Sequence, residues 1–68
     1  MIDYSRSDIE HAIDEWILNE KYRAIMKRRL IDGITYEWLA DEFQMSTSQI
    51  KRIVYKCEDR IFKHLPLG

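Results

Sequence analysis

Apolar residues recur at helical spacing along nearly the whole chain. Four segments each carry an apolar residue every third or fourth position, which predicts four amphipathic helices. These helices are expected to cover residues 7–18, 20–32, 36–43 and 47–64. Only two glycines and one proline interrupt the chain, and it contains no run of alternating β-branched residues. The pattern therefore predicts an all-α fold, a small four-helix domain spanning residues 1–68.

Capping residues indicate where these helices begin and end. Ser7 is followed by Glu10, and Ser46 by Gln49, so each pair is typical of a capping box at a helix N-terminus. Gly33 is expected to end the second helix in the left-handed conformation, which costs glycine nothing. Asn19 and Thr35 suit the N-caps of the second and third helices. The expected buried residues are Ile9, Ala12, Ile13, Trp16 and Ile17, then Tyr22, Ile25, Met26 and Leu30, then Tyr36, Leu39, Ala40 and Phe43, and finally Ile50, Ile53, Val54, Cys57, Ile61 and Leu65 before Pro66.

Residues 35–54 predict a helix-turn-helix. Ala40 is small enough for a steep helix crossing, Met45 places an apolar residue in the turn, and Ser46 caps the second helix. Gln44 stands where the turn usually holds glycine, and a side chain in the left-handed region costs roughly 1 kcal/mol. The polar side of the second helix is left free, which favours contact with the major groove of DNA.

The resemblance to a known family extends beyond this motif. It rests on the segment Glu20–Leu30, on Asp32-Gly33 followed by Thr35-Tyr36-Glu37, and on Leu39-Ala40 ahead of the helix capped by Ser46. Over residues 20–64 the chain resembles the C-terminal promoter-recognition domain of bacterial sigma factors and its stand-alone relatives. The resemblance implies a small cytoplasmic transcription regulator, of a kind also found in prophages, that binds double-stranded promoter DNA, with RNA polymerase as a further candidate partner. Nothing in the chain corresponds to the domain that melts promoter DNA, so a complete sigma factor is not expected.

The residues expected to contact DNA lie mainly off the apolar stripe of the last predicted helix. Residues on its first turns would reach base edges, and residues further along would meet phosphates. The predicted set is Thr47, Ser48, Lys51, Arg52, Tyr55 and Lys56, with Arg60 further along and with Lys27 and Arg28, beside Arg29, as additional phosphate contacts. A solvated helix face is the alternative for the last helix. For the earlier cluster, the alternative is a basic helix C-terminus that complements the helix dipole.

The overall charge of the chain argues against DNA binding, whereas the distribution of the charges along the chain is compatible with it. The net charge is −1 and the pI is near 6.1, which is not typical of a DNA-binding domain. The charges occur in blocks, however. Residues 1–20 hold six acidic and one basic residue, residues 21–33 one acidic and five basic, residues 34–43 three acidic, and residues 44–68 two acidic and five basic. Local basic faces are therefore expected on a nearly neutral molecule.

The remaining candidate chemistry is sparse. A single cysteine, Cys57, excludes an intrachain disulfide, and its place on an apolar stripe indicates a buried thiol. His11 and His64 have no metal-ligand spacing, and no nucleophile lies near a base, so neither a metal, a cofactor nor an enzymatic activity is expected. No apolar run is long enough to span a membrane and the N-terminus lacks a signal peptide core, which favours the cytoplasm.

Two aromatic residues are candidates for contact with a partner protein. Trp38 lies between the buried and exposed sides of its helix, where it either covers the edge of the core or anchors a partner, and Phe62 poses the same question. A 68-residue chain buries only a modest fraction of its surface, so a homodimer is also compatible with the sequence. The leading expectation is a sequence-specific DNA-binding regulator. The alternative is a sigma-like interaction module that binds RNA polymerase or another regulator with little DNA contact.

Overall fold

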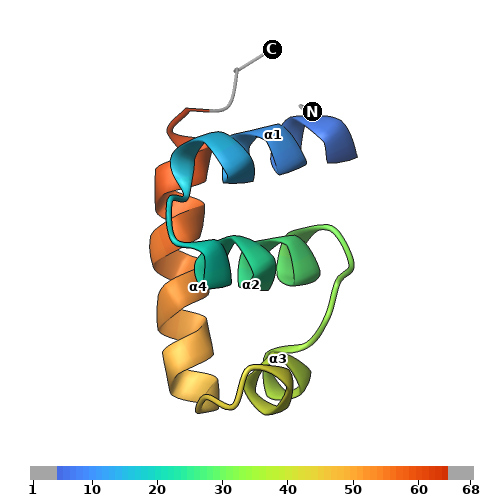
Figure 1. The fold of residues 1–68 in the computed structure, drawn as a ribbon, viewed down its shortest axis with the longest axis vertical. Coiled ribbons are helices and arrows are strands. Elements are labelled where there is room, and N and C mark those ends of the chain that lie inside the picture. Colours follow the sequence, from blue (N-terminus) through green and yellow to red (C-terminus); the bar gives the residue numbers. More distant parts are fainter. Residues whose placement is uncertain (1–4, 65–68) are drawn as a thin grey trace.

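In the computed structural model, the described residues form four helices in the order the sequence predicts. They are α1 (Arg6–Trp16), α2 (Glu20–Leu30), α3 (Tyr36–Glu42) and α4 (Thr47–Phe62). The structure describes residues 5–64, so the expected positions of Leu65 and Pro66 lie outside the described residues. In Figure 1, α4 runs vertically, and α1 and α2 both lie across it, with α1 near its C-terminal end and α2 below α1. The α3 helix lies beside the N-terminal end of α4. The prediction of an all-α, four-helix fold is confirmed.

The core forms where the apolar stripes of the helices meet. Because α4 packs against each of the other three helices, its stripe is the common wall of the core. The buried residues all come from the predicted stripes: Ala12, Ile13, Ile17, Ile25, Met26, Leu39, Ala40, Ile50, Ile53, Val54, Cys57 and Ile61. Trp16 differs from the prediction, since it lies at the edge of the core and stacks on His64 with ring centroids 3.6 Å apart. The opposite side of α4 is consequently left to the solvent.

The first helix begins earlier than predicted, and Ser5 instead of Ser7 is its N-cap. Both serines are followed three residues later by an acidic residue, so the sequence offered two capping boxes. In the structure, the Ser5 hydroxyl accepts the backbone N–H of Asp8 at 3.1 Å, and the Asp8 carboxylate accepts the backbone N–H of Ser5 at 3.3 Å. The prediction based on Ser7 and Glu10 is wrong, because the upstream box extends the helix and encloses Ser7 in its first turn.

The predicted helices also run too far at their C-termini, by one residue in α3 and by two in the others. At the end of α1, Ile17 leaves the helix in an extended conformation with φ −105° and ψ 105°. The guanidinium of Arg23 donates to the carbonyl oxygens of Ile17 and Leu18, both at 3.1 Å. Because a side chain from α2 donates to these carbonyl oxygens, they have hydrogen-bond partners without a further turn of α1.

The remaining capping predictions concern Gly33, Asn19 and Thr35. Gly33 has the predicted left-handed conformation, with a φ of 71°, but it lies two residues beyond the C-cap Ile31 because α2 already ends at Leu30. Asn19 and Thr35 accept backbone N–H groups at the starts of α2 and α3, at 3.1 Å and 3.2 Å. Within the described residues, no helix is long and apolar enough to cross a membrane.

Candidate nucleic-acid interface

The turn between α3 and α4 has a well-defined backbone geometry. Gln44 adopts a φ of 54°, as the sequence predicts for the position that usually holds glycine. The N–H of Met45 donates to the carbonyl of Ala40 at 2.8 Å, and the N–H of Gln44 donates to the carbonyl of Asp41 at 3.3 Å. This pair of hydrogen bonds is a Schellman motif, which ends α3 and reverses the chain within four residues.

The start of α4 is fixed by the predicted capping box. The Ser46 hydroxyl accepts the N–H of Gln49 at 3.1 Å, and the Gln49 amide oxygen accepts the N–H of Ser46 at 3.0 Å. Met45 packs partly buried against the core just before this cap, so the N-terminus of α4 is held from two sides. Two tight junctions thus set the direction in which the outer face of α4 points.

The outer face of α4 carries most of the residues expected to contact DNA. Ser48, Lys51, Arg52, Tyr55 and Lys56 are all exposed, while Thr47 is half-buried. Helical spacing sets Ser48, Arg52 and Tyr55 opposite the buried stripe. Arg52, Lys56 and Arg60 follow one another at intervals of four residues and form a row, here called the α4 cation row. None of these three has an ion-pair partner among residues 5–64.

Lys51 lies differently from the other cations of α4. Its ammonium is 5.7 Å from the centre of the Tyr36 ring, and the guanidinium of Arg29 is 4.2 Å from the same centre. Tyr55 meets Tyr36 edge-on, with ring centroids 6.2 Å apart. Lys51 is therefore drawn toward Tyr36 at the start of α3. Sequence reasoning missed this cluster because its members come from three helices.

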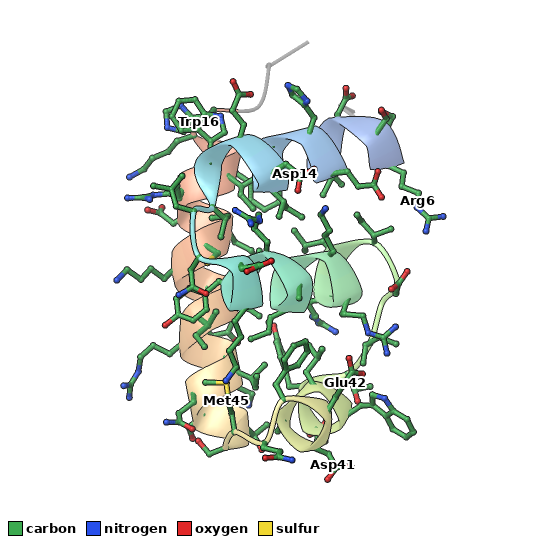
Figure 2. The ribbon with its side chains drawn as sticks, in the orientation of Figure 1. Arg6, Asp14, Trp16, Asp41, Glu42 and Met45 are labelled. Atoms are coloured by element: carbon green, nitrogen blue, oxygen red, sulfur yellow. The ribbon has the colours of Figure 1, made fainter. Side chains whose placement is uncertain are left out.

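The cations at the end of α2 are engaged within the protein. The Lys27 ammonium lies 2.7 Å from the Asp14 carboxylate, which points from α1 toward α2 in Figure 2. Arg28 binds Glu42 through two nitrogens, at 2.7 Å and 3.1 Å, and binds Asp32 at 3.3 Å. Hydrogen bonds from these cations are the main reason that the pKa values of Asp14 and Glu42 fall below their usual range. Lys27 and Arg28 are therefore neutralised locally and do not extend the free cations of α4.

Acidic side chains border the turn on the α3 side. Glu37 and Asp41 are exposed, and Figure 2 shows Asp41 at the end of the molecule that α3 occupies. Negative charge there would repel a phosphate backbone. The exposed acidic residues of α3 and the α4 cation row therefore give different charges to the two sides of the turn.

The two candidate partner-contact residues occupy different parts of the molecule. Trp38, on α3, keeps 63% of its surface exposed, and Phe62, in the last turn of α4, keeps 42%. Such exposure of Trp38 disfavours its role as a cover for the core edge. The Trp38 side chain also contributes, after Arg28, to the lowered pKa of the Glu42 carboxylate.

The two histidines and the single cysteine are the remaining candidates for chemistry. No group of three or more metal-ligating side chains occurs within residues 5–64. His11 pairs with Glu15 at 3.2 Å, and His64 is occupied by its stack on Trp16. Cys57 is buried as expected, and burial raises the pKa of its thiol. Comparison with known proteins adds no assignment, because no family model, no curated protein and no solved structure matches this chain.

Proposed function

We propose that this chain is a double-stranded DNA-binding transcription regulator whose recognition helix is α4. The observation that carries the proposal is the outer face of α4, which is polar and rich in free cations. A Schellman turn and a capping box hold this face away from the core. Helix-turn-helix proteins insert such a face into the major groove, which admits one α-helix. The resemblance to sigma-factor promoter-recognition domains supports the same function.

The side chains of α4 divide into two roles under this proposal. Ser48 and Arg52 lie near the N-terminus of the helix and opposite the core, where hydrogen bonds to base edges would give sequence specificity. Lys56 and Arg60 lie further along the α4 cation row and would bind phosphates, which fixes the register without reading sequence. Lys51, held beside Tyr36, would contact a phosphate near the start of α3.

The acidity of the whole chain is compatible with this interface because the favourable charges are local. Two of the acidic residues, Asp14 and Glu42, are neutralised by Lys27 and Arg28. The exposed acids of α3 lie on the other side of the turn from the α4 cation row. Repulsion from them is screened over about 8 Å at physiological ionic strength, whereas a bound phosphate lies in direct contact with its cation.

The deciding experiment measures binding to a genomic fragment library at several salt concentrations. The wild type is compared with the double variant Lys51→Ala/Arg52→Ala. Each neutralised phosphate contributes roughly −0.9 to the slope of log Kobs against log salt, so the loss of one or two contacts flattens the slope by about 1 to 2. We expect the double variant to bind at least tenfold more weakly at a fixed salt concentration, on the order expected for lost base and phosphate contacts.

The matched control is Arg6→Ala/Lys21→Ala, which removes the same charge from exposed positions on α1 and α2. Equal weakening by both double variants would show that only the net charge matters and would contradict α4 as the recognition helix. No retained fragment at low salt would refute DNA binding itself.

One observation favours a second candidate function. The large exposed surface of Trp38 is typical of an anchor residue in a protein interface. In this alternative, the domain binds RNA polymerase or another regulator and contacts DNA weakly. Co-purification of polymerase that Trp38→Ala abolishes, together with no fragment retained at low salt, would favour the interaction module.

A further inference from the structure

An apolar groove with a basic rim lies where the turn between α1 and α2 meets α4. Its floor is formed by Ile17, Tyr22 and Cys57, and Leu18 forms a wall that is 80% exposed. Lys56 and Arg60, one turn apart on α4, line its mouth, and neither has an ion-pair partner among the described residues. The groove therefore offers an apolar surface beside two free positive charges.

The volume of the groove indicates the size of its occupant. It encloses about 230 Å³. Binding sites for small molecules usually enclose roughly 300–1,000 Å³, so this groove is small for a metabolite. An apolar side chain from another protein fits this volume better, since anchor residues in interfaces are commonly single aromatic side chains in a pocket. Because Lys56 and Arg60 line the mouth of the groove, acidic groups beside that side chain would complement their positive charges.

The chain itself carries a surface with these properties on α3. Trp38 is 63% exposed, and the exposed Glu37 and Asp41 lie beside it on the same helix. Neither of these acids forms an ion pair within residues 5–64. Glu42 lies on the other side of Trp38 and is already bound by Arg28. An aromatic side chain flanked by two free carboxylates is the chemical complement of the groove.

We infer that the domain associates with a second copy of itself, Trp38 of one copy inserting into the groove of the next while Glu37 and Asp41 face Lys56 and Arg60. The two surfaces occupy different parts of the molecule. In Figure 1, α3 lies at the lower end, whereas the turn between α1 and α2 lies along the upper part of α4. After the first contact forms, one copy therefore keeps a free groove and the other keeps a free Trp38 surface. Such a contact is head-to-tail and produces rings or open chains of copies.

This association does not rest on the proposed DNA binding, although both would use Lys56 and Arg60, and it is therefore tested without DNA. Sedimentation velocity over a range of protein concentrations is expected to show that the average mass of the wild type rises with concentration. Trp38→Ala and Lys56→Glu/Arg60→Glu are each expected to stay monomeric, with an association constant lowered roughly 30-fold or more, as truncation of an anchor residue produces. High salt is expected to weaken the wild-type association, because part of the contact is ionic.

A mixture of the two variants provides the sharpest measurement. Trp38→Ala retains the groove and Lys56→Glu/Arg60→Glu retains Trp38, so together they form one intact contact. The mixture is expected to reach twice the monomer mass and to stop there, whereas the wild type continues to larger species. Circular dichroism would confirm that each variant keeps its helical content, since all three substituted side chains are exposed.

Two further variants serve as controls for these substitutions. Tyr55→Ala removes an exposed aromatic residue outside both surfaces, and Arg52→Glu/Lys63→Glu makes the same charge change away from the groove. Both are expected to associate like the wild type. A wild type that stays monomeric up to about 1 mM, the range of the weakest specific complexes, would overturn the inference. Failure of the mixture to dimerise, or equal loss in the controls, would do the same.

Discussion

Two basic clusters of this molecule each contain three cationic side chains, and their surroundings differ. The first, Lys27-Arg28-Arg29, ends α2, and the second is the α4 cation row formed by Arg52, Lys56 and Arg60. Every cation of the first cluster has a partner: Asp14 for Lys27, Glu42 for Arg28, and the Tyr36 ring and a backbone carbonyl for Arg29. The cations of the second have no ion-pair partner among the described residues.

The difference follows from the position of each helix in the fold. The α2 helix packs against both α1 and α3, and each of these helices presents an acidic side chain to it. The outer side of α4 faces no other helix, because α4 directs only its apolar stripe at the rest of the domain. A run of basic residues therefore indicates a binding surface only where the fold leaves its charges unpaired.

The largest expected effect separates the two clusters by DNA affinity. Arg52→Ala/Lys56→Ala should weaken DNA binding by roughly tenfold to a hundredfold and flatten the salt slope by about 1 to 2, since free cations bind phosphates or base edges. Lys27→Ala/Arg28→Ala should change affinity less than threefold, because those cations are already neutralised. Fluorescence anisotropy with one labelled DNA fragment measures both variants. The comparison fails if the α2 variant loses as much affinity as the α4 variant.

The pairing that distinguishes the clusters could not be predicted from the sequence. Apolar periodicity specified the four helices and all of the buried residues, because burial depends on spacing within one helix. Arg28 and Glu42 are 14 positions apart, and they meet only because α2 packs against α3. The Tyr36 ring attracts Lys51 for the same kind of reason. Such contacts depend on how each helix is rotated about its axis and on the angle at which two helices cross. The spacing of apolar residues within one helix specifies neither.

Local errors in the prediction have a different origin. Ser5 and Ser7 both fit a capping box, and the sequence alone did not rank them. The early end of α1 depends on Arg23, whose guanidinium binds the carbonyls of Ile17 and Leu18 from the next helix. In contrast, Ser46 and Gln44 were predicted correctly, since the cap and the turn that position α4 are made by neighbouring residues.

A smaller effect tests the positive φ of Gln44 in the turn that precedes the free face of α4. Gln44→Gly should stabilise the domain by about 0.5–1 kcal/mol, because glycine adopts the positive φ of this position without strain. DNA affinity should stay unchanged, since the backbone conformation is retained. Urea denaturation measures the free energy of unfolding. Ala24→Gly, at an exposed position within α2, is the control and should destabilise by about 1 kcal/mol. A loss of stability in Gln44→Gly would contradict the turn geometry.

The third effect concerns stability and should again separate the two clusters. Arg28→Ala should lower the free energy of unfolding, because it removes both hydrogen bonds to Glu42 and the contact with Asp32. Arg52→Ala should leave stability within about 0.5 kcal/mol, as is usual for an exposed residue without specific contacts. Urea denaturation in low and high salt measures both variants. The difference between them should shrink in high salt, where exposed ion pairs are screened. Equal stability of the two variants in low salt would show that the α2 ion pairs contribute nothing.

The smallest effect is the pH dependence of that same ion pair. The hydrogen bond from Arg28 lowers the folded-state pKa of Glu42 from its ordinary value of 4.5, so unfolding raises the affinity of this carboxylate for a proton. Its contribution to stability is therefore fully present above the ordinary pKa and is lost as the pH falls through the lowered folded-state pKa. The wild type should exceed Glu42→Gln in stability at pH 7, and this advantage should disappear in the acid range below about 4.5, where the glutamate of the unfolded chain becomes protonated. Thermal unfolding of both proteins across this range measures the difference. An advantage that stays constant from neutral to acid pH would show that Glu42 stabilises the domain without its charge, and that the α2 cluster is held by packing instead of by ion pairing.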